Sequence, residues 1–80
     1  MELHQRFGRN VKLARKAAGY SQEAFADVAG IARSYMSDVE RGARNPTLKV
    51  VERIASALDM PPEVLLSPDY NPVRPQKAAL

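Results

Sequence analysis

Cysteine is absent from the 80-residue sequence, and histidine occurs only once, at His4. The chain can therefore form no disulfide and offers no thiolate to a metal, and nothing in it points to an oxidising compartment. The single histidine lies beside the N-terminus and has no acidic or cysteine partner in a recognisable motif. We accordingly expect no catalytic site, no metal and no cofactor.

Long apolar runs are also missing. No window approaches the length needed to span a bilayer, and the N-terminus lacks the uninterrupted apolar core of a signal peptide. We expect no membrane association and a cytoplasmic location. A chain this short makes one domain with a modest core, so stabilisation by a second copy is expected.

Positive charge is in slight excess and is unevenly placed. Twelve Lys and Arg against nine Asp and Glu give a formal charge of +3. Residues 1–20 carry five bases against one acid, whereas residues 21–60 carry five bases and six acids. The N-terminal excess could be a footprint for phosphate or an ordinary solvated helix face, and charge alone favours the solvated face.

Apolar residues recur at intervals of three and four, and no alternating strand pattern is present. This spacing predicts an all-α fold. The first helix is expected over about 2–18, where Gly19 ends it. Four further helices are expected: 22–29 after the N-cap Ser21, about 32–40 before Gly42, one after the N-cap Thr47 with an apolar stripe to Leu58, and 62–66.

The composition changes after Leu66. Three further prolines follow, together with few apolar residues. We therefore predict one domain over residues 1–66 and a flexible C-terminal tail over 67–80.

The segment from Ser21 to Gly42 holds two short helices joined at Gly30, an arrangement typical of a helix-turn-helix. Ile31, Met36 and Val39 share the inner face of the second helix. The outer face carries hydrogen-bonding groups of both polarities: Arg33, Ser34, Ser37, Asp38 and Arg41. Arg can fork onto guanine and Asp can accept from cytosine, so this pattern indicates a helix that reads bases in the major groove.

Several motifs at independent spacings extend this pattern over residues 7–66. They are R-x-x-x-G-x-S-Q at 15–22, Gly30, E-R-G at 40–42, N-P-T at 45–47, Ala55 with Leu58, and Leu65-Leu66. The sequence is similar to the lambda-repressor-like helix-turn-helix family of the Cro/C1 or XRE type. Within it, the string at 33–42 most resembles restriction-modification controller proteins. The resemblance implies a compact five-helix DNA-binding domain with its helix-turn-helix at helices 2 and 3.

The resemblance also implies roles for individual residues. Base-reading residues would be Arg33, Ser34, Ser37 and Asp38; DNA backbone contacts would be Gln22, Tyr35, Arg41, Arg44 and Asn45; a structural salt bridge would join Arg15 and Glu40; and the dimer interface would include Val64 and Leu66.

Some of these assignments leave alternatives. Asp38 could repel wrong sequences or orient Arg33, Tyr35 could be half-buried packing, and Arg44 could reach a base edge. Ala32 stands where the family commonly has Ser or Thr, so the recognition helix could start one residue late.

We therefore expect a sequence-specific transcriptional regulator that binds a near-palindromic operator in double-stranded DNA as a homodimer. It would act in the cytoplasm, at a bacterial or phage nucleoid, with a possible RNA polymerase contact and no evident small-molecule effector. The alternative is an antitoxin-type protein that binds DNA and a protein partner, with Leu13, Val28 and the proline-rich tail as the additional surface.

Overall fold

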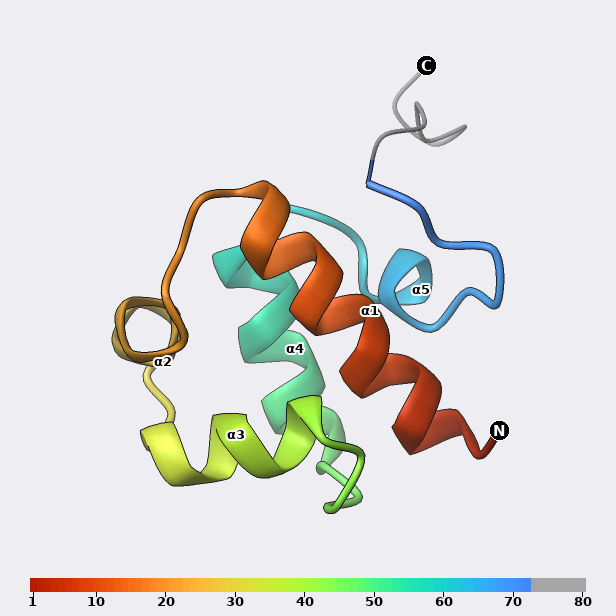
Figure 1. Ribbon diagram of the computed structural model, residues 1–80, viewed down its shortest axis with the longest axis horizontal. Helices are drawn as coiled ribbons and strands as arrows, with labels where there is room; N and C mark the ends of the chain where they lie inside the picture. Colours follow the sequence, from red (N-terminus) through yellow and green to blue (C-terminus); the bar gives the residue numbers. More distant parts are fainter. Residues whose placement is uncertain (73–80) are drawn as a thin grey trace.

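The computed structural model describes residues 1–72, which form five α-helices and no strand, so the expected all-α fold is confirmed (Figure 1). The helices are α1 (Leu3–Ala17), α2 (Gln22–Ala29), α3 (Arg33–Glu40), α4 (Leu48–Ala57) and α5 (Pro62–Leu65). In Figure 1, α1 crosses in front of α4, while α2 and α3 lie together on the opposite side of the molecule from α5. Within the described residues, no helix is both long and apolar enough to cross a membrane.

Local signals explain where α2 begins and ends and where α4 begins. The Ser21 hydroxyl accepts a hydrogen bond from the Ala24 amide at 3.0 Å, and the Thr47 hydroxyl does the same for Val50 at 3.2 Å. Both satisfy a free amide of the first helical turn. Gly30 ends α2 in the left-handed conformation, with φ of 71°.

The start of α3 differs by one residue from the expected range. Ala32 is the N-cap, the helix begins at the next residue, Arg33, and no side-chain cap hydrogen bond is made. An alanine has no oxygen to accept from the first-turn amides. Ala32 thus contributes backbone geometry only.

Side chains from all five helices meet in a single core. The largest fully buried apolar side chains are Phe7 and Val11 from α1, Phe25 from α2, Met36 and Val39 from α3, Ile54 from α4, and Leu65 from α5. α1 lies against α3 at Gly8, where an added Cβ would fall 2.0 Å from the Val39 carbonyl oxygen. Glycine is therefore required for this close approach of two backbones.

The packed part of the chain continues past Leu66. Asn10 is fully buried, and its amide donates at 2.8 Å to the carbonyls of Leu65 and Ser67. Tyr70 is only 6% exposed and belongs to the core, so packing against the helices extends beyond residue 66. Proline-rich composition indicates where helices stop, but one aromatic side chain is enough to anchor an irregular segment. Residues 73–80 of the expected tail lie outside the described residues.

Candidate nucleic-acid interface

α3 has one buried and one polar face. Met36 and Val39 are fully buried beneath it, whereas Arg33 and Ser34 are exposed at its N-terminal end. Ser37, on the same polar side, is half-buried. Burying the apolar face holds the helix on the core, and this leaves a surface of hydrogen-bonding groups directed outward.

Arg33 is the first residue of α3 and is unengaged. Among residues 1–72, its guanidinium takes part in no ion pair and no side-chain hydrogen bond. A planar fork of donors on an exposed helix end can meet guanine O6 and N7 without first breaking an internal contact.

Asp38 is the acid at the centre of this surface. Its Oδ1 pairs with Arg41, and its Oδ2 accepts from Arg44 at 3.4 Å. Asp38 therefore does not orient Arg33. The Arg44 guanidinium also lies 4.3 Å from the centre of the Tyr35 ring, which is half-buried. The expected packing role of Tyr35 therefore includes a cation–π contact with a loop arginine.

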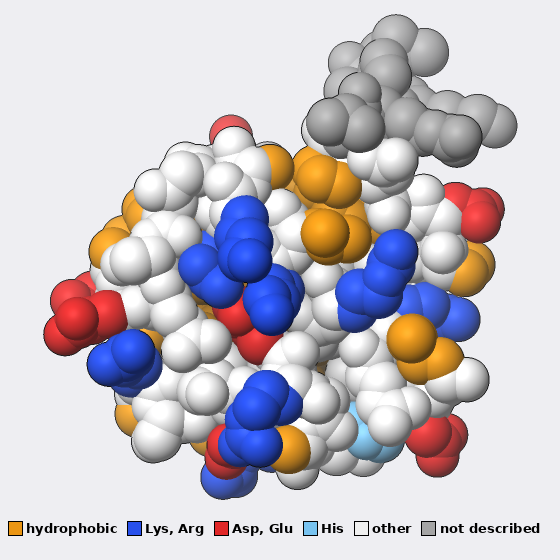
Figure 2. All heavy atoms as spheres, in the orientation of Figure 1, with side chains coloured by type: hydrophobic (Ala, Val, Ile, Leu, Met, Phe, Trp, Pro, Cys, Tyr) orange, Lys and Arg blue, Asp and Glu red, His pale blue; other side chains and the backbone are white. Residues whose placement is uncertain are grey.

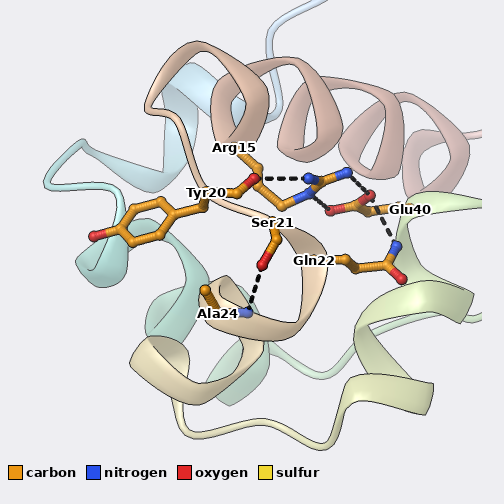
Figure 3. A network of polar contacts seen from close by, with 6 residues as sticks. All are labelled: Arg15, Tyr20, Ser21, Gln22, Ala24 and Glu40. Atoms are coloured by element: carbon orange, nitrogen blue, oxygen red, sulfur yellow. Dashed lines mark hydrogen bonds and ion pairs between the residues drawn. The ribbon is translucent and has the colours of Figure 1, made fainter.

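A buried network fixes the start of α2 against α1 and α3 (Figure 3). Glu40 accepts from Arg15 twice, at 2.7 Å from Nε and 3.0 Å from Nη2, and both side chains are more than nine-tenths buried. This is the ion pair that the resemblance implied. The same carboxylate accepts from the Gln22 amide at 3.2 Å, while Arg15 also donates to the Tyr20 carbonyl at 2.9 Å.

Gln22 is thus held by the scaffold in the free protein. Gln22 is the first residue of α2, where backbone N–H groups and the helix dipole favour a phosphate oxygen. The contact with Glu40 directs the side chain toward α3, as Figure 3 shows. The start of α2 is thereby tied to the C-terminal end of α3.

Positive side chains gather on the face that carries α1 and α3. Figure 2 shows Lys and Arg over the middle of this face, with most Asp and Glu toward its edges. Arg41, Arg44 and Asn45 are all exposed after α3. These exposed basic side chains provide positive charge beside the polar face of α3.

The comparisons with known proteins decide the family. The profile of a family described as helix-turn-helix matches residues 11–65, which include all of α2, α3 and α4. The chain belongs to this helix-turn-helix family. Its relatives are DNA-binding transcriptional regulators of the XRE/Cro-C1 type, and not enzymes.

Three similar proteins illustrate this helix-turn-helix family. The transcriptional regulator SinR of Bacillus subtilis is 38% identical over 65 residues, which are 80% of this chain and 59% of SinR. This chain thus spans little more than half of that relative. The solved restriction-modification controller protein C.AhdI of Aeromonas hydrophila is 41% identical, with a TM-score of 0.75 over 80% of this chain and 96% of that one. C.Esp1396I, solved bound to a 25 base pair operator site, is 31% identical, with a TM-score of 0.73 over 81% and 86%.

Val64 and Leu66, the residues expected in a dimer interface, lie in and after the last helix of the helix-turn-helix domain. Both are half-buried and pack against the core. Leu66 also lines a groove of about 380 Å³ with Leu3 and Leu48, which are 52% and 85% exposed. On another surface Val28 is exposed, whereas Leu13 is half-buried.

Sequence reasoning missed two residues that position the interface. Gly8 permits the contact of α1 with α3, and Asn10 ties α1 to the C-terminal segment. Both are poor helix formers inside the expected first helix, and glycine there costs about 1 kcal/mol relative to alanine. A residue kept at such a cost indicates a packing role. A glycine and an asparagine beside Phe7 and Val11 were the available signals.

Proposed function

We propose that this protein is a sequence-specific transcriptional regulator that places α3 in the major groove of double-stranded DNA. The observation that carries the proposal is the outward polar face of α3, with Arg33 and Ser34 exposed above buried Met36 and Val39. A regulator of the same family, C.Esp1396I, has been solved on an operator site.

Within this proposal, Arg33, Ser34 and Ser37 read base edges. Asp38 completes the reading set as an acceptor for an amino group of cytosine. DNA backbone contacts are assigned to Gln22 at the start of α2, to Tyr35 in the first turn of α3, and to three residues after α3, namely Arg41, Arg44 and Asn45. The exposure of Arg41, Arg44 and Asn45 beside the polar face supports this division between docking and reading.

We further propose that two copies associate through a surface that includes Val64 and Leu66. A twofold pair would set two recognition helices about 34 Å apart, one turn of duplex, and would read a near-palindrome. The exposed apolar side chains of Leu3 and Leu48, which line a groove with Leu66, support self-association on this side. Bound at a promoter in the cytoplasm, such a dimer would block RNA polymerase or contact it.

The test begins with selection of bound sequences from a random duplex pool. Arg33→Ala is then measured on the selected operator and on a scrambled duplex at one fixed salt concentration. We expect a loss of about 1–3 kcal/mol on the operator alone, because a bidentate base contact carries sequence information. Equal weakening on both duplexes would show that Arg33 contacts phosphate and does not read a base.

A further inference from the structure

Asp38, Arg41, Arg44 and Tyr35 form a linked group, which we call the Asp38 cluster. Each carboxylate oxygen of Asp38 accepts from a different arginine: Oδ1 from Arg41 and Oδ2 from Arg44. Arg44 is simultaneously stacked over the Tyr35 ring, with its guanidinium carbon 4.3 Å from the ring centre. One carboxylate thus holds two cations that would otherwise face DNA independently.

The geometry of the Asp38 cluster exceeds that of an ordinary helix-surface ion pair. Arg41 follows Asp38 by three residues, a spacing at which neighbours on a helix commonly pair. Arg44, however, comes from the loop after α3 and is fixed from two sides, by Asp38 and by Tyr35. The loop arginine is therefore brought to the polar face of the recognition helix by contacts that α3 itself provides.

The Asp38 cluster is open to solvent, so a second partner can reach its charged groups. The side chains of Arg41 and Arg44 are 64% and 47% exposed, whereas that of Asp38 is 31% exposed. Ion pairs at this exposure are weak, so a phosphate can take either guanidinium from the carboxylate. That exchange leaves a negative charge close to the DNA, which is unfavourable unless a donor on a base edge satisfies it.

We propose that Asp38 is a positioning residue that restrains Arg41 and Arg44 and thereby weakens binding to random DNA more than binding to the operator. On a matching site, an amino group of cytosine or adenine meets the carboxylate after the arginines have moved to phosphates. On a non-matching site no amino group faces the carboxylate. Either Asp38 then keeps its arginines from the phosphates, or its unpaired charge repels the DNA. This inference rests on the proposed placement of α3 in the major groove.

The experiment compares Asp38→Asn with the wild-type chain on the selected operator and on a scrambled duplex, at several salt concentrations. We expect Asp38→Asn to tighten binding to the scrambled duplex by roughly two- to thirtyfold, the combined range of two exposed ion pairs. Operator affinity should change less, so the ratio of the two affinities falls. The salt dependence on the scrambled duplex should steepen by about one phosphate contact for each arginine released.

Two further variants separate position from bulk charge. Glu52→Gln removes the same charge from the exposed side of α4, away from the Asp38 cluster, and should leave the ratio unchanged. In a chain that already carries Arg41→Ala and Arg44→Ala, Asp38→Asn should tighten binding to the scrambled duplex much less, because only the repulsion between the carboxylate and the phosphates is then removed. Asp38→Glu, which keeps the charge, should restore most of the wild-type ratio.

An equal effect of Asp38→Asn on both duplexes, an equal effect of Glu52→Gln, or an undiminished effect without the two arginines would each overturn the inference. Failure of the proposed function has a different signature, because the wild-type chain would then prefer no selected duplex over a scrambled one. Circular dichroism of every variant establishes that the compared proteins are folded.

Discussion

Glu40 accepts three hydrogen bonds, two from Arg15 and one from Gln22, in a site that excludes almost all water. The carboxylate therefore compensates a buried cation and also restrains the side chain at the start of α2. A buried pair of this kind is costly to break because the remaining partner keeps its desolvation penalty.

At the scale of the residue, Glu40→Gln should lower the free energy of unfolding by about 3–5 kcal/mol, since it leaves the Arg15 guanidinium buried without a counter-charge. Urea denaturation followed by circular dichroism measures the loss. Glu52→Gln, an exposed control of the same chemistry, should stay within about 0.5 kcal/mol of the wild-type value. Similar losses in both variants would mean that the buried pair contributes nothing specific.

The resemblance to a family implied the pairing of Arg15 with Glu40, but nothing in the sequence showed that Gln22 completes it. Contacts between residues 18 positions apart depend on how helices pack and on which rotamer a flexible side chain adopts. The same limit applies to Arg44 over Tyr35 and to the amide of Asn10. At this scale the sequence shows which side chains are available, and the packing of the helices decides which of them are in contact.

At the scale of the element, prediction from the sequence is more complete, because the signals are local. Ser21 and Thr47 cap the helices that they were expected to cap, whereas Ala32 is the N-cap of α3 without a side-chain oxygen to accept from the first-turn amides. The closeness of α1 to α3 is different. It depends on the absence of a side chain at Gly8, and only the assembled helices show what that absence accommodates.

Gly8→Ala tests the contact of α1 with α3. Alanine improves helix propensity by about 1 kcal/mol, yet its Cβ would lie 2.0 Å from the Val39 carbonyl oxygen, which is backbone and cannot rotate away. We expect a net destabilisation of about 1–3 kcal/mol from the forced separation of the helices, measured by thermal or urea unfolding. A variant more stable than the wild-type protein would contradict the close approach.

At the scale of the whole molecule, Tyr70 links the irregular C-terminal segment to the core. Burial raises the pKa of its phenol above the ordinary value of 10.0. Below that pH the phenol is neutral in both the folded and the unfolded chain, so its burial is not opposed by ionisation. Above it the unfolded chain loses the proton first, and stability falls as the pH rises further.

Tyr70→Phe should remove this contribution. We expect the wild-type unfolding temperature to drop more than that of the variant between about pH 8 and about pH 11, a window that spans the ordinary tyrosine pKa. Differential scanning calorimetry at the two pH values provides the comparison. Equal drops would show that the Tyr70 hydroxyl does not titrate in a buried environment.

Self-association is also a property of the whole molecule. Val64→Glu should shift the protein toward monomer in sedimentation equilibrium at micromolar concentration, since a charge would be desolvated at the proposed dimer surface. Val28→Glu is the matched control, because Val28 is 56% exposed on a different helix. A wild-type protein that stays monomeric with and without operator would refute the dimer.

The eight-residue α3 is too short to be stably helical by itself, since isolated helices shorter than about 12–15 residues are marginal in water. Its contact with α1 at Gly8 and its buried Met36 and Val39 hold it in shape before any DNA arrives. The conformational entropy of ordering the reading surface is therefore lost during folding and not during association. Calorimetric titration with operator should accordingly give a heat capacity change that reflects the surface buried between protein and DNA, without the larger contribution of a helix that folds as it binds.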